Sequence, residues 1–199
     1  MMNLLLFIKH RLGIIWRVAE FFNGFVFKLL YRNKILESID VACKQASTAQ
    51  YDLRMLQRDD LTELSDFFKS QPSESYMYFK PHGVELHDLI QNYKNPAFIM
   101  YGVFDKSNGG VICGYFMTRF FANKKCFVGF LVDAASRGKG IAGLMGKTML
   151  TICWNNNFEA LATVSRKNDA ALRAYRKLND FKILKELPND YIYIRYERK

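Results

Sequence analysis

A glycine-rich corner between two regular segments carries the strongest chemical signal in this sequence. Residues 127–132 form an apolar run, and the segment after residue 140 has apolar residues at helical spacing. The corner between them contains Arg137, Gly138, Lys139 and Gly140. A strand, a tight turn and a helix start are predicted, and the main-chain N–H groups of a helix start attract anions. Because the glycines admit a ligand close to the main chain and the cations add charged donors, the corner predicts a pyrophosphate site.

The spacing of this corner differs from that of dinucleotide-binding and nucleotide-triphosphate loops. Taken alone, it also fits an ordinary solvated turn. It resembles the acyl-CoA signature of the GNAT superfamily of N-acyltransferases, Q/R-x-x-G-x-G/A, with Arg137, Gly140 and Ala142 at the defined positions.

A second part of the chain resembles the same family. Its N-x-x-A-x-x-x-Y-x-K pattern is matched by Asn168, Ala171, Tyr175 and Lys177. The chain then departs from the family, because Asn179-Asp180 stands where a single glycine usually precedes the phenylalanine, here Phe181. Asparagine tolerates the left-handed conformation better than most residues, so we expect the turn to survive.

The resemblance implies acetyl-CoA as co-substrate and assigns roles to both signatures. Main-chain groups of Phe130, Leu131 and Val132 would bind the pantetheine arm. The pyrophosphate would lie at the helix start, on Arg137, Gly138, Lys139, Gly140, Ile141 and Ala142. Asn168 would contact the pantetheine, and the Tyr175 hydroxyl would protonate the leaving sulfur as a general acid. From the residues alone, Tyr175 also fits a packed amphipathic side chain, and Asn168 a helix N-cap.

The sequence offers several candidates for the general base. Residues 126–130 of the predicted central strand contain no carboxylate, where many relatives carry a glutamate. Other candidates lie further towards the N-terminus, at Glu74, His82, Glu85 and His87. Of these, His82 has a suitable ordinary pKa and is our predicted base, with a water chain to solvent as the alternative. No residue spacing predicts a metal site.

These residues need a sheet that brings the corner and the second signature together. Strands are predicted near residues 51–56, 97–104, 111–121, 127–132, 158–164, 181–187 and 191–198, and helices after Asp59 or Asp60, at 84–93, from 141 to about 154, and at 169–178. This order is that of the GNAT fold. The predicted class is therefore α+β, with a mixed six- to seven-stranded sheet flanked by helices, and the catalytic domain spans residues 51–199.

Composition limits the partners. The formal net charge of +10 favours anionic ones: a cofactor phosphate, a membrane surface or nucleic acid. The four cysteines have neither C-x-x-C nor zinc spacing, and three lie in apolar runs. Buried free thiols are therefore expected, which fits a reducing cytoplasm.

The first 37 residues differ from the rest and predict a basic amphipathic helical extension. An apolar side forms at helical spacing from Leu4 to Leu29, and basic residues interrupt it too often for a membrane span. We expect Gly13 and Gly24 to break this helix, and residues 38–50 to form a connector. The extension fits the surface of an anionic bilayer, at the inner face of the membrane, or else packing on the domain or on a second subunit. Nucleic acid is not expected as a partner, because it would leave the apolar side uncovered.

The predicted activity is transfer of an acetyl group from acetyl-CoA to a primary amine. The arrangement resembles enzymes of bacterial surface-polysaccharide pathways, which implies an amino sugar as acceptor. Aromatic residues in the loop 71–83 are expected to form one wall of its pocket. The alternatives are a GNAT enzyme for a protein N-terminus or small amine, and a non-catalytic module that binds acyl-CoA.

Overall fold

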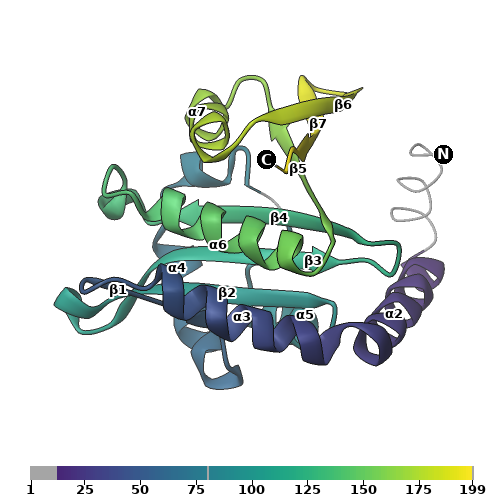
Figure 1. Ribbon diagram of the computed structural model, residues 1–199. Coiled ribbons are helices and arrows are strands. Elements are labelled where there is room, and N and C mark those ends of the chain that lie inside the picture. Colours follow the sequence, from purple (N-terminus) through teal and green to yellow (C-terminus); the bar gives the residue numbers. More distant parts are fainter. Residues whose placement is uncertain (1–12, 80, 199) are drawn as a thin grey trace.

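A computed structural model describes residues 13–79 and 81–198, and the described chain is built on a seven-stranded sheet (Figure 1). The strands are β1 (Tyr51–Met55), β2 (Phe98–Asp105), β3 (Val111–Phe120), β4 (Lys125–Val132), β5 (Glu159–Ser165), β6 (Phe181–Leu187) and β7 (Tyr191–Tyr196). They lie in the order β1-β2-β3-β4-β5-β7-β6. The β4–β5 pair is parallel and the other neighbours are antiparallel. The sheet is therefore mixed, as predicted.

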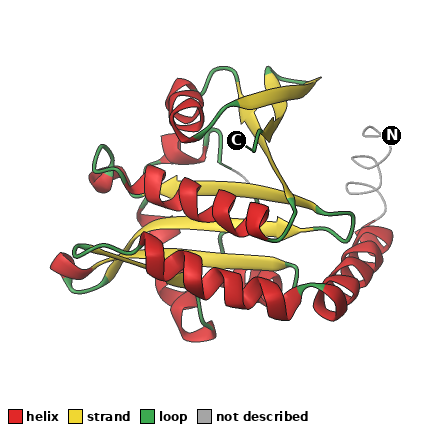
Figure 2. Cartoon of the chain, viewed as in Figure 1, coloured by secondary structure: helices red, strands yellow, loops and turns green. Residues whose placement is uncertain are grey.

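Helices cover both faces of this sheet (Figure 2). Their bounds are α2 (Gly13–Leu30), α3 (Arg32–Ala46), α4 (Leu61–Ser70), α5 (Leu86–Tyr93), α6 (Ile141–Asn155) and α7 (Asp169–Leu178). Helices α3 and α6 lie side by side across one face, and α4 and α5 lie behind the sheet (Figure 1). This element order confirms the order predicted from the sequence.

Alternation along the strands sends side chains into two cores. On β3, Tyr115 and Met117 belong to the cluster under α4 and α5, whereas Phe116 belongs to the cluster under α3 and α6. Successive side chains of a strand point to opposite faces, so one apolar strand can serve both layers. The four cysteines are buried free thiols, as predicted.

The N-terminal helices differ from the sequence-based expectation in two places. Residues 38–46 were expected in a connector, but they continue α3, because Ile35, Ile39, Ala42 and Cys43 are buried at helical spacing. Gly24 does not break the helix; it lies inside α2. A Cβ at Gly24 would come within 3.0 Å of Asn95 Oδ1, so glycine lets this helix lie close to the segment before β2.

Helix α2 is fastened to the domain through its inward side. Asn23 accepts a hydrogen bond from the Ala122 N–H (3.0 Å) and donates one to the Phe120 carbonyl (2.9 Å). The ring of Phe27 is fully buried and stacks on Phe120 with 5.1 Å between centroids. This part of the extension packs on the domain, which was one of the expected alternatives. None of the helices described has the length and apolar composition needed to cross a bilayer.

Candidate active site

Strands β4 and β5 separate shortly after they begin. Residues 125–127 of β4 pair with residues 159–161 of β5, but the strands continue to Val132 and Ser165. Beyond the paired residues, the edge of β4 that faces β5 has no strand partner in the described chain. Its main-chain N–H and C=O groups are thus available to a ligand, since a buried peptide group requires a hydrogen-bond partner. The gap is a place where an extended polar chain can pair with β4.

A cavity of about 1780 Å³ occupies this gap. Residues 128–132 of β4 and 163–165 of β5 line its middle. The start of α6 lines the end near Val132, and Asn23, Arg119 and Asn123 line the end where β4 begins. Sites for single drug-sized ligands are usually about 300–1,000 Å³, so this cavity has room for two substrates.

The corner between β4 and α6 has the geometry of an anion site. Gly138 and Gly140 have φ angles of 81° and 83°, a conformation that side chains disfavour. A Cβ built on either would meet nothing within 4 Å, so the space above the loop is open. The first turn of α6 carries no acidic residue and no side-chain cap, and its first bonded N–H groups are those of Gly143 and Leu144, so the N–H groups of Ile141 and Ala142 are left for a ligand. Arg137 donates to Ser75 Oγ (2.7 Å) and so links this loop to the segment after α4.

A buried glutamine holds the beginning of the loop. The Gln71 side chain donates to Asp133 Oδ1 (2.9 Å) and accepts from the Ala134 N–H (3.1 Å). Gln71 ends α4 and is 6% exposed. Its amide therefore ties the helix on one face of the sheet to the residues that lead into the anion corner.

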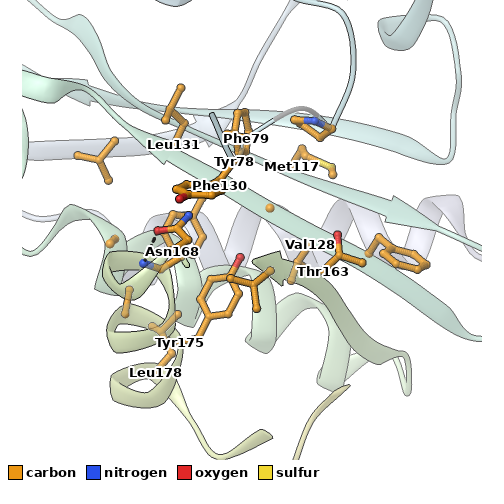
Figure 3. Close-up of a pocket in the computed structure, with 18 of the residues that line it drawn as sticks. Tyr78, Phe79, Met117, Val128, Phe130, Leu131, Thr163, Asn168, Tyr175 and Leu178 are labelled. Atoms are coloured by element: carbon orange, nitrogen blue, oxygen red, sulfur yellow. Dashed lines mark hydrogen bonds between the residues drawn. The ribbon is translucent and has the colours of Figure 1, made fainter. Parts of the chain in front are cut away.

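Helix α7 brings two polar side chains to the cavity (Figure 3). Asn168 precedes the helix and caps it, accepting from the Ala171 N–H at 3.0 Å. Tyr175 lies about two turns further along the same side of the helix, and its hydroxyl is directed into the cavity opposite Phe79 and Met117 (Figure 3). Burial raises the pKa of Tyr175 to about 12, so the phenol stays protonated and can donate a proton at neutral pH.

Comparison with known proteins identifies the family of this chain. The model of the acetyltransferase (GNAT) family matches residues 59–181. The chain belongs to the GNAT family. Its members are acyl-CoA-dependent N-acetyltransferases, so this chain is such an enzyme and acetyl-CoA is its co-substrate. The chain's own features fit that ligand: an unpaired strand edge for the pantetheine arm and an open anion corner for the pyrophosphate.

Solved structures share the fold at low sequence identity. The GNAT domain of S. lividans PAT is 16% identical with a TM-score of 0.61, covering 72% of this chain and 88% of that one. The ribosomal-protein-S5-alanine acetyltransferase from Vibrio fischeri is 14% identical with a TM-score of 0.61, covering 76% and 94%. AAC(6')-Ib in complex with paromomycin and acetyl-CoA is 17% identical with a TM-score of 0.58, covering 75% and 94%. A comparison with curated proteins finds no match.

Most residues predicted to bind the co-substrate of this GNAT enzyme line the cavity. They are Phe130, Leu131, Val132, Arg137, Gly138, Gly140, Ile141, Ala142 and Asn168, together with the predicted acid Tyr175. Lys139 is exposed and is not part of the lining. The roles of these residues stay predictions; what the structure adds is that one cavity brings them together.

His82 lies behind the cavity wall. Its ring packs against Phe68, Phe98 and Tyr115. Nε2 lies 2.7 Å from the Tyr115 hydroxyl and Nδ1 lies 2.6 Å from the Gly83 carbonyl oxygen. Both ring nitrogens thus have protein partners, and His82 is not among the lining residues. This geometry gives no support to the predicted general base and favours a packing role, because His82 contacts Tyr115, whose ring in turn contacts Phe79 of the cavity wall.

Several lining residues were not singled out from the sequence. These residues are Lys147 of α6 and Arg173 of α7, and together with Lys177 of the second signature they add positive charge to the lining that includes the anion corner. A phosphate elsewhere on the co-substrate could pair with them. The sequence signal of Lys147 and Arg173 is weak, because single basic residues on a helix are usually solvated. Glu20 and Glu74 are the acidic lining residues in the described chain.

Proposed function

We propose that this enzyme transfers the acetyl group of acetyl-CoA to the primary amine of an amino sugar during surface-polysaccharide assembly. The single observation that carries the transfer is the β4–β5 gap, which joins an open anion corner to a buried, protonated tyrosine. The sugar acceptor is the finer part of the proposal. It rests on the composition of the end of the cavity where β4 begins, which we call the acceptor end.

In the proposed reaction, groups of the chain bind the diphosphate, polarise the thioester carbonyl and protonate the departing sulfur. The N–H groups of the anion corner hold the diphosphate, and a main-chain N–H of residues 130–132 polarises the thioester carbonyl. The neutral amine nitrogen forms the new C–N bond as the C–S bond breaks. Tyr175 gives its proton to the departing sulfur, and the amine loses its extra proton to water in the cavity.

The acceptor end of the cavity supports a sugar. Its walls carry several aromatic rings, including Phe98, Phe127 and Tyr193, and Phe127 stacks on Tyr193. Flat apolar rings suit stacking against the face of a sugar. One similar structure is an aminoglycoside acetyltransferase in complex with kanamycin, and aminoglycosides contain amino sugars.

A different amine remains the competing acceptor. The structural neighbours include a ribosomal-protein-S5-alanine acetyltransferase and a spermidine acetyltransferase. Aromatic walls also suit a peptide, so a protein N-terminus or a polyamine is the second candidate. A non-catalytic acyl-CoA-binding module would need no proton donor, and the position of Tyr175 argues against it.

A substrate panel separates these candidates. The full chain is titrated with acetyl-CoA by calorimetry, and thiol release is then followed with amino sugars, nucleotide-linked amino sugars, spermidine and peptides. The proposal expects binding, with the highest kcat/KM on a sugar amine. Activity confined to peptides or polyamines would overturn the sugar acceptor, and binding without thiol release from any amine would overturn the transfer.

We place the enzyme in the cytoplasm, at the inner face of the membrane, because of its basic N-terminal segment.

A further inference from the structure

Helix α2 has a large apolar face that no described residue covers. Its outward side carries exposed apolar residues, which we call the outer face: Val18, Phe21, Phe22, Phe25, Leu29 and Leu30. Their exposed fractions run from 49% at Val18 to 73% at Leu29. The inward side holds Asn23, Gly24 and Phe27 against the domain. A contiguous group of this size on one helix marks an interaction surface, because single exposed apolar residues are normal but clusters are not.

Charge decides which partner fits the outer face. Glu20 is the only acidic residue in residues 1–36, and its carboxylate pairs with Arg119 of β3. The basic residues of the same segment are Lys9, Arg11, Arg17, Lys28, Arg32 and Lys34. A second copy docked on this face would bring two positive segments together, and like charges repel. An anionic surface would attract the segment instead.

We propose that the outer face of α2 docks into the headgroup region of an anionic bilayer. Its aromatic and aliphatic side chains enter the boundary with the acyl chains, and neighbouring lysines and arginines pair with lipid phosphates. Trp16, in the same helix, is of a type enriched at this boundary.

Docking there would determine how the acceptor arrives. Ala19, Glu20 and Asn23, on the same helix, line the cavity near the start of β4. Figure 1 shows α2 at the edge of the molecule, beyond the start of β4 and apart from the start of α6. A bilayer on the outer face would therefore lie next to the acceptor end and leave the anion corner open to the solution. This consequence, which rests on the proposed function, assigns the amine to an amphiphile anchored in the leaflet.

The test measures partitioning of the full chain without acetyl-CoA. Vesicles of equal parts phosphatidylglycerol and phosphatidylethanolamine are compared with vesicles of phosphatidylcholine. We expect binding to the anionic vesicles that weakens with added salt. Phe21→Glu/Phe25→Glu should lower the partition coefficient at least about tenfold, since it replaces buried aromatic surface with charge that anionic lipids repel. The matched control, Ile183→Glu/Leu184→Glu, makes the same charge change on exposed apolar residues of β6 and should reduce binding far less.

The result that would overturn the proposal is equal partitioning of the wild type and Phe21→Glu/Phe25→Glu. Sedimentation of a wild-type dimer that this variant converts to monomer, with no vesicle binding by either, would assign the outer face to a second copy instead. Calorimetry with acetyl-CoA verifies that both variants are folded, because neither pair of residues lines the cavity. Failure to bind vesicles leaves acetyl-CoA binding and thiol release intact, so it is distinguishable from failure of the proposed function.

Discussion

Tyr175 combines the two properties that a general acid for a thiolate needs. Its hydroxyl points into the cavity, and burial keeps the phenol protonated by raising its pKa to about 12. The ring is held by neighbours on two sides, Phe130 and Tyr196, at centroid distances of 5.7 Å each. Removing the hydroxyl therefore removes the proton without removing the packing.

Tyr175→Phe should lower kcat by about 100-fold, the lower range for loss of a general acid. The dissociation constant for acetyl-CoA should stay within about twofold of the wild type, because the anion corner is untouched. In the wild type, no loss of activity from Tyr175 is expected up to about pH 11, since the raised pKa keeps the acid form populated. Steady-state kinetics and calorimetry measure both quantities. An unchanged kcat would exclude the tyrosine as acid.

Gln71 should act on binding through the loop that it holds. Gln71→Leu leaves Asp133 Oδ1 and the Ala134 N–H without this partner. We expect the dissociation constant for acetyl-CoA to rise about tenfold, equivalent to about 1.4 kcal/mol, with kcat at saturation largely retained. Gln91→Leu makes the same change at an exposed position of α5 and should have no effect. If both variants bind acetyl-CoA equally, Gln71 does not position the loop.

The burial of His82 should make the free energy of unfolding of the protein depend on pH. Desolvation by burial lowers its pKa below the ordinary 6.5, so below that pH the unfolded chain binds a proton that the folded chain does not. His82 therefore costs the folded chain no stability above pH 6.5. As the pH drops below 6.5, the free energy of unfolding falls, because the unfolded chain gains a proton that the folded chain does not. In urea unfolding at about pH 7 and about pH 5, the neutral His82→Gln variant should lose less stability than the wild type. Identical losses would contradict a buried neutral imidazole.

At the scale of elements, close packing of α6 and α7 sets the position of the second signature. A Cβ at Gly146 of α6 would lie 2.2 Å from Cδ1 of Leu178 at the end of α7. A Cβ at Gly143, one turn earlier, would meet nothing within 4 Å. Alanine at Gly146 would therefore collide with Leu178, whereas alanine at Gly143 would not, and the two variants form a matched pair.

Gly146→Ala should lower the free energy of unfolding by about 1–3 kcal/mol, because Leu178 must move. Gly143→Ala should raise it by up to about 1 kcal/mol, since alanine has the better helix propensity. Thermal and urea unfolding of the two variants give the comparison. Equal stability of both would mean that α7 can shift without cost, and that Tyr175 is not held by this contact.

The same scale explains what the sequence could predict. The anion corner and the Asn168 cap were predictable because their residues are neighbours in the chain and their spacing reflects local backbone geometry. Helix α3 was missed in part, since the small polar residues around Ile39 and Cys43 hid a buried stripe at helical spacing. Propensity is a weak guide there, because packing on the sheet decides.

Long-range contacts were beyond prediction from the sequence. The hydrogen bond between Gln71 and Asp133 joins residues 62 positions apart, and no local sequence pattern predicts it. His82 illustrates the same limit: its type suggested a base, but Tyr115, 33 positions away, occupies its Nε2.

At the scale of the whole molecule, the cavity connects an anion corner, an aromatic acceptor end and a helix with an uncovered face. Residues from α2, β3, β4, β5, α6 and α7 all line it. A ligand that spans such a cavity stabilises the folded chain by mass action, by about 2.7 kcal/mol at a hundredfold excess over its dissociation constant. The account therefore depends on the co-substrate lying along the β4–β5 gap.

The most direct measurement is a crystal structure of the complex with acetyl-CoA. We predict the diphosphate over the N–H groups of residues 138–142, the pantetheine arm paired with residues 130–132 of β4, and the sulfur within hydrogen-bond reach of the Tyr175 hydroxyl. A complex with the diphosphate away from that corner, or with Tyr175 turned from the sulfur, would contradict the account.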